Sequence, residues 1–261
     1  MGSFIFMLRP STWKFVYVSG SVTDVLGFEE EQILQFRMTD LLPEEEQELV
    51  DSTLSAAIRE NKAAISVYAR LLNSVRMVYV VCQMSISVAG NVIVGSISQA
   101  SLDTIGHTVR DQSAEEVVVA ATELSDHPGM MGYPALNWTG TQFARTVLLL
   151  DRFSSDCPIT HCTNNAILDN ETCVHQGFFR YVAPQDEASV KSFIASLRRA
   201  GLEANGLTNG FVYHTFTLCV AGRDLRASSA HSTLNGNNEV RVSAVGSATS
   251  DGFILVLKRE H

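Results

Sequence analysis

Two successive sets of alternating and helical patterns run along this chain. In the first set, β-branched and aromatic residues or period-two alternation predict five strands, at Phe4–Leu8, Lys14–Val18, Lys62–Leu72, Met77–Val88 and Asn91–Ser98. Between the second and third strands, three short helical turns precede a longer helix, which begins at Pro43 and extends to about Asn61. Strands joined by short turns pair antiparallel, and helices gathered in one stretch of the chain cover one face of such a sheet.

The second set repeats this order at a period of about 140 residues, which by itself indicates two domains. Its predicted strands are Ala144–Leu150, Ile159–Cys162, Phe211–Val220, Glu239–Ala248 and Gly252–Lys258. A helix follows Pro184, carries apolar residues at helical spacing and ends at Gly201. The sequence therefore predicts an α+β fold with two domains, each a five-stranded antiparallel sheet with short helices and one longer helix on one face.

Residues 101–142 do not follow this repeated order of strands and helices. The segment His127–Pro134 is rich in Gly and Pro, and Ala114–Leu124 has the composition of a short helix after a capping-box spacing. We interpret residues 1–100 as the first domain, 101–142 as a connector and 143–261 as the second domain.

The strand Met77–Val88 has two different faces. One face is apolar throughout, whereas the other begins with Met77, Tyr79 and Val81 and then turns polar. An apolar patch on the side opposite the helices has to be covered, either by this chain's own first strand or connector or by a partner. Met77, Tyr79 and Val81 are therefore candidate interface residues.

Residues 14–50 resemble the first half of a PAS domain. The strand Val16–Ser19, the turn Leu26-Gly27, the segment Glu30–Leu34 and the step Leu41–Glu45 follow one another in the family's order and spacing. In the second half, Phe178, Val182, Pro184 and Asp186 resemble the family's Phe-x-x-x-Val-x-Pro-x-Asp signature. The stretch LLLDRFSSDCPITHCTNNA resembles PAS repeats of eukaryotic, particularly fungal, regulatory proteins. Together these resemblances cover about four-fifths of the chain.

The resemblance implies a small cavity between helices and sheet in each domain. His214 alternates with Phe216 on the face of its strand that is expected to point inward. We predict a ligand cavity bordered by His214, Phe216, Phe178 and Phe193, and leave the ligand's identity open. Two other interpretations stand beside it: His214 is a satisfied core or rim histidine, or the bulky Phe178, Phe179, Phe193 and Phe216 fill the cavity of a purely structural dimerisation scaffold.

Composition and charge narrow the classes of function. With 46% hydrophobic and 18% charged residues, the chain has the composition of an ordinary globular protein. Its net charge of −9, with no cationic cluster beyond Arg198-Arg199 and Lys258-Arg259, argues against direct nucleic-acid binding. No apolar run is long enough to span a membrane. Five cysteines at irregular spacing favour reduced thiols in the cytoplasm or nucleus.

Cofactor, metal and catalytic signatures are weak. A flavin photoreceptor of the PAS family would require Gly-x-Asn-Cys-Arg-Phe-Leu-Gln, which neither Cys162 nor Cys173 carries, and neither long helix contains a histidine for haem. A zinc site would draw on Cys157, His161, Cys162, Cys173 and His175, whose spacings differ from the usual ligand pairs. No hydrolase, phosphate-loop or metalloprotease motif is present, so we expect no enzymatic activity, no bound cofactor and no metal.

These observations predict a tandem PAS sensory and protein-interaction module of a signalling or transcription-regulating protein. The resemblance implies dimerisation with another PAS-containing protein or with a second copy, controlled by a ligand or partner. The alternative is a photo- or redox sensor that carries flavin or haem.

Overall fold

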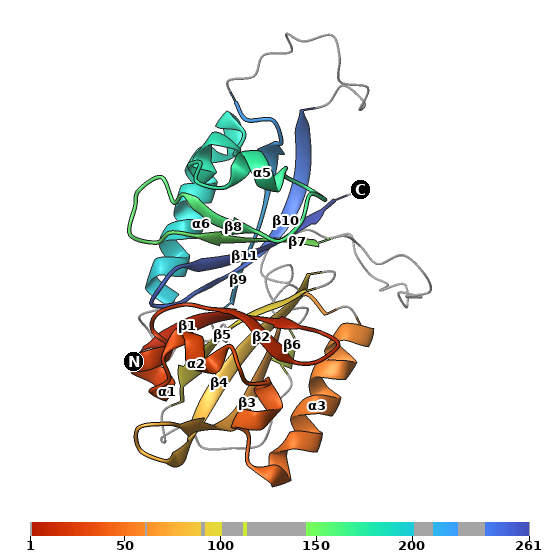
Figure 1. The fold of residues 1–261 in the computed structure, drawn as a ribbon. Coiled ribbons are helices and arrows are strands. Elements are labelled where there is room, and N and C mark those ends of the chain that lie inside the picture. Colours follow the sequence, from red (N-terminus) through yellow and green to blue (C-terminus); the bar gives the residue numbers. More distant parts are fainter. Residues whose placement is uncertain are drawn as a thin grey trace. The chain divides into compact units, whose positions relative to one another are not determined.

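The computed structural model describes residues 2–60, 62–89, 92–100, 112–113, 145–200, 211–223 and 238–260. The chain divides into two compact units, Met1–Phe143 and Ala144–His261 (Figure 1). The expected connector and its short helix Ala114–Leu124 lie outside the described residues, apart from Gln112 and Ser113. Each unit is described below by itself.

The first unit is one antiparallel sheet with a helical layer. Its elements are β1 (Ser3–Arg9), β2 (Lys14–Val18), α1 (Val22–Leu26), α2 (Glu30–Ile33), η1 (Met38–Leu41), α3 (Glu44–Arg59), β3 (Ile65–Asn73), β4 (Val78–Ala89), β5 (Val92–Gln99) and β6 (Gln112–Ser113). The strand order is β2-β1-β5-β4-β3-β6, and every pairing is antiparallel. Five of these strands were predicted. The sixth, β6, adds two residues of the expected connector to the edge of β3.

Local sequence signals explain where the helices of this unit begin and end. Gly27 ends α1 in the left-handed region, with φ of 78°, which a residue without Cβ adopts at little cost. Glu29 and Gln32 form a capping box at the start of α2. Pro43 precedes α3, and the three glutamates that follow place negative charge at the positive end of the helix dipole.

The second unit repeats the sheet of the first. Its elements are β7 (Arg145–Leu150), β8 (Ile159–Cys162), α5 (Asn170–Cys173), η2 (Phe178–Arg180), η3 (Pro184–Asp186), α6 (Glu187–Ala200), β9 (Phe211–Cys219), β10 (Glu239–Ala248) and β11 (Phe253–Arg259). The order β8-β7-β11-β10-β9 matches β2-β1-β5-β4-β3 strand for strand, and all pairs are antiparallel. The predicted α+β fold with antiparallel five-stranded sheets is confirmed.

Each unit has its own hydrophobic core between helices and sheet. In the first unit, Phe4, Phe6 and Leu8 of β1 pack with Val50 and Leu54 of α3 among other buried residues. In the second, the core includes residues of β7, η2, α6 and β9, and α6 lies along one face of the sheet (Figure 1). Within the described ranges, no helix combines the length and the apolar character needed to cross a membrane.

Predicted strand ends differ from the observed ones by up to three residues: β3 begins at Ile65 rather than Lys62, and β4 begins one residue later than predicted. Met77 was expected to begin the fourth strand, but it lies in the turn between β3 and β4, and β4 begins at Val78. Met77 has φ of 52°, a left-handed conformation that is incompatible with an extended strand. The turn is fixed by Asn73, whose side-chain oxygen accepts a hydrogen bond from the Arg76 N–H at 2.9 Å.

Candidate functional site

The four residues predicted to border a cavity form one continuous row of rings in the second unit. Phe178 comes from η2, Phe193 from α6, and His214 and Phe216 from β9. The Phe178 and Phe216 rings meet edge to face with centroids 6.1 Å apart. His214 stacks on Phe193 at 5.5 Å and on Phe216 at 6.1 Å. We call these four residues the aromatic row.

The rings of the aromatic row contact one another directly. Its three phenylalanines are buried, and the distances between the rings are those of aromatic pairs in direct contact. A ligand would therefore have to lie beside the row rather than between its rings. The prediction that these residues bind a ligand remains untested.

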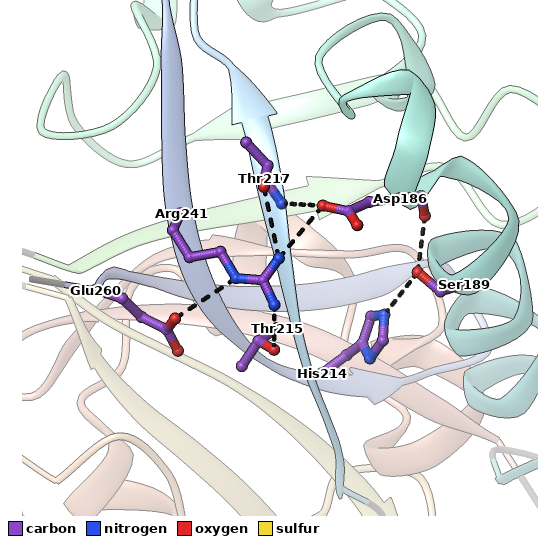
Figure 2. Close-up of polar contacts among 7 residues, drawn as sticks. All are labelled: Asp186, Ser189, His214, Thr215, Thr217, Arg241 and Glu260. Atoms are coloured by element: carbon purple, nitrogen blue, oxygen red, sulfur yellow. Dashed lines mark hydrogen bonds and ion pairs between the residues drawn. The ribbon is translucent and has the colours of Figure 1, made fainter. Parts of the chain in front are cut away.

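A hydrogen bond anchors His214 at the polar end of the row (Figure 2). Its Nε2 lies 3.2 Å from the Ser189 hydroxyl oxygen, and that hydroxyl donates to the backbone oxygen of Asp186 at 2.8 Å. Because the hydroxyl proton is directed to Asp186, the contact is completed by an imidazole that donates from Nε2. The arrangement is opposite to that of a catalytic serine–histidine pair, in which the imidazole accepts the hydroxyl proton.

The surroundings of His214 disfavour its charged form. Burial lowers the pKa of His214, and the positive charge of Arg241 acts in the same direction. The Asp186 carboxylate raises the pKa, but by less than burial lowers it. His214 is thus hydrogen-bonded and partly buried beside the core, and its role at a ligand cavity stays a prediction.

Asp186, from the family-like Pro-x-Asp segment, covers part of the open edge of β9 (Figure 2). Its Oδ2 accepts a hydrogen bond from the Thr217 N–H at 2.7 Å and lies 3.4 Å from the Arg241 guanidinium. Arg241 also donates to the Thr215 hydroxyl at 2.9 Å and pairs with Glu260 at 3.7 Å. These ion pairs are partly exposed, so each contributes about 0–1 kcal/mol to stability. Their clearer role is to hold the end of η3 against β9.

The predicted interface residues lie on an exposed apolar surface of the first unit. Met77 is 74% exposed and Tyr79 is 46% exposed, whereas Val81 is partly buried further along β4. Val75 and Val78 of the same hairpin are 78% and 48% exposed. Sequence reasoning did not include these two residues, because Val75 lies in the turn and Val78 alternates onto the other face of β4. We call Val75, Met77, Val78 and Tyr79 the hairpin patch.

An open depression of about 440 Å³ lies beside the hairpin patch. It is lined by Gly27, Phe28, Glu29, Gln32, Phe36 and Ser74. The Gln32 side chain is already engaged, because its oxygen accepts from the Glu29 N–H at 2.9 Å. The Leu26-Gly27 turn and the segment Glu30–Leu34 were sequence signals near this depression, but the ligand cavity was predicted in the second unit.

The residues considered for zinc do not converge. Among the residues that the structure describes, no three His, Cys, Asp or Glu side chains form a group able to hold a metal. Cys162 and Cys173 are both buried free thiols, and the Cys162 thiol donates to the Asn164 backbone oxygen at 3.2 Å. Interaction with Cys162, together with burial, raises the pKa of the Cys173 thiol, whereas interaction with Cys173 lowers the pKa of the Cys162 thiol.

Comparison with known proteins gives matches among solved structures alone. No protein-family model matches the sequence, and neither does any curated protein. One similar structure is the PAS domain of the RpfR quorum-sensing receptor from Cronobacter turicensis in complex with BDSF, at 9% identity and a TM-score of 0.34. Another is the N-terminal domain of a diguanylate cyclase with a PAS/PAC sensor from Marinobacter aquaeolei, at 15% identity and a TM-score of 0.31. Each match covers 39% of this chain, and 96% and 97% of the respective domains.

Proposed function

We propose that this chain is a tandem PAS sensory and protein-interaction module of a signalling or transcription-regulating protein, of the kind found in eukaryotic regulators. It acts by ligand- or partner-dependent dimerisation and catalyses no reaction. Its partner is another PAS-containing protein or a second copy, and its five free thiols suit the cytoplasm or nucleus. The duplicated sheet order and the matching sequence motifs support the tandem assignment.

The observation that carries the interaction role is the hairpin patch. Helices pack on one face of the first sheet, so the opposite face of β4 keeps Tyr79 exposed next to Met77. Scattered apolar residues are ordinary on a protein surface, but this one hairpin exposes four of them, and Met77 and Tyr79 offer apolar area that a partner can cover. A change in the helical layer would reach this surface through the sheet and shift the population of the bound form.

The test combines Tyr79→Glu with Val81→Glu and measures molar mass by light scattering. Two carboxylates on the covered face would cost several kcal/mol to desolvate, so the double variant is expected to lose the dimer. Leu49→Glu is the matched control, because Leu49 is an exposed apolar residue, 48% accessible, on α3. A dimer that withstands the double variant would remove the hairpin patch from the interface.

The same purified sample tests the sensory role. Its visible absorption spectrum is expected to be flat, and native mass spectrometry is expected to show a small bound mass or the protein alone. A flavin or haem band would overturn the proposal in favour of a cofactor-bearing photo- or redox sensor.

A further inference from the structure

β3 and β9 occupy the same position in the two sheets, and the later part of each strand has the same kind of contact at its outer edge. In the first unit, the Glu46 carboxylate accepts a hydrogen bond from the Arg70 N–H at 2.8 Å. In the second, the Asp186 carboxylate accepts one from the Thr217 N–H at 2.7 Å (Figure 2). Arg70 and Thr217 are therefore equivalent positions, and the outward N–H of each is satisfied by an acidic residue just after the proline of its unit.

Four residues before these positions, the two edges differ. Ser66 of β3 pairs with Gln112 of β6, so a two-residue strand of the chain covers the edge there. The equivalent residue of β9 is Tyr213. Alternate residues of an edge strand direct both backbone groups outward, and Thr217 does so, because its carbonyl accepts from the Ala183 N–H at 2.9 Å. Tyr213 and Thr215 share this outward direction.

The outward backbone groups of Tyr213 and Thr215 have no partner within the described residues. The strand around them, Phe211–Thr215, consists of aromatic and β-branched residues and one histidine. It contains none of the lysines, prolines or acidic residues with which natural edge strands prevent pairing with another strand. Unpaired edges of this kind are templates for strand addition.

We infer that the edge of β9 at Tyr213–Thr215 is a dimer contact, at which β9 of a second copy of this chain adds antiparallel. This inference rests on the proposed function, since it names a contact through which the module dimerises. Pairing about a two-fold axis at His214 places Tyr213 of each copy opposite Thr215 of the other. Each such pair exchanges both backbone hydrogen bonds, so the edge is complementary to itself. The two sheets then join into one continuous sheet.

A short edge contact buries little surface, so the dimer it forms dissociates on dilution. Light scattering across a concentration series is expected to show a mass rising from 28.5 kDa towards twice that value. Tyr213→Pro removes an outward N–H and costs no hydrogen bond to β10, because that N–H points away from β10. This variant is expected to stay at the monomer mass. Tyr213→Thr keeps the N–H and changes only the side chain, so it is expected to dimerise like the wild type.

A second measurement does not depend on any variant. Amide hydrogen exchange at Tyr213 and Thr215 of the wild-type protein is expected to slow by tenfold or more as dimer forms. Exchange at Ser66, whose edge is already paired with β6, is expected to stay constant. A wild-type protein that is monomeric at all concentrations, or a Tyr213→Pro dimer, would overturn the inference.

The outcomes separate this inference from the proposed function. Loss of the dimer in Tyr79→Glu/Val81→Glu together with a dimeric Tyr213→Pro would retain the interaction module and reject the β9 edge. The reverse result would establish the β9 edge as the contact and reject the hairpin patch.

Discussion

His214 illustrates what a single residue contributes to this protein. Its ring lies between Phe193 and Phe216, so protonation would place a charge against two apolar rings. Burial lowers the pKa of His214 in the folded state, whereas the unfolded chain titrates near the ordinary value of about 6.5. Below that value the unfolded state binds more protons, so the stability contributed by neutral His214 is present above about pH 6.5 and is lost as the pH falls through the folded pKa.

The expected result is a thermal midpoint of the second unit that falls between pH 7.5 and pH 5.5, with a smaller fall in His214→Gln. Glutamine keeps a donor for Ser189 and carries no titrating proton. Differential scanning calorimetry at several pH values measures the difference. An equal fall in both proteins would show that another group, for example His161 with its pKa also lowered by burial, controls the pH dependence.

Alternation along the strand was sufficient to place His214 and Phe216 on the inward face. It could not predict the Ser189 contact, because that contact depends on how α6 is rotated over β9. The same holds for Asp186. Its motif was recognised, but the bond to the Thr217 N–H requires the register of a strand about 30 residues away.

Two strand glycines show how tightly elements pack in each unit. A Cβ at Gly95 of β5 would lie 2.3 Å from the Ser85 carbonyl oxygen and 2.6 Å from Phe6 Cζ. A Cβ at Gly246 of β10 would come nearest to side-chain atoms rather than backbone, Leu197 Cδ1 at 2.8 Å and Phe193 Cζ at 2.9 Å. Gly95→Ala is expected to lower the free energy of unfolding by about 3 kcal/mol, and Gly246→Ala by about 1 kcal/mol.

Chemical denaturation of both variants measures this difference, with each variant serving as the other's control. If both variants lose the same free energy of unfolding, the backbone of β4 moves aside for the new methyl group as easily as the Leu197 side chain does. The sequence showed both glycines inside predicted strands but could not distinguish a bulge from a close approach of a neighbour. The two-residue strand β6 was not predicted either. Gln112 and Ser113 are too few to show a period in the sequence, and they form a strand by pairing with the edge of β3.

At the scale of the whole molecule, the repeat in the sequence predicted two sheets of the same order, and two sheets of the same order are found. The repeat gave this result because each unit buries its own apolar face, so the pattern of each half is self-sufficient. Surfaces were harder to predict than cores. The hairpin patch and the edge of β9 depend on which atoms remain uncovered, and hydrophobic periodicity does not record that.

Because each unit has its own core, we expect a core mutation to destabilise only the unit that contains it. Phe216 and Phe6 are fully buried, one in each core, and truncation of a buried phenylalanine costs about 3–5 kcal/mol. Phe216→Ala is expected to raise hydrogen exchange throughout β7–β11 and to leave β1–β5 protected, and Phe6→Ala to do the opposite. Exchange measured by mass spectrometry on both variants tests this directly. If either substitution deprotects both sheets equally, the two units unfold as one cooperative body, and a signal received by one core would reach the other through shared stability rather than through a surface contact.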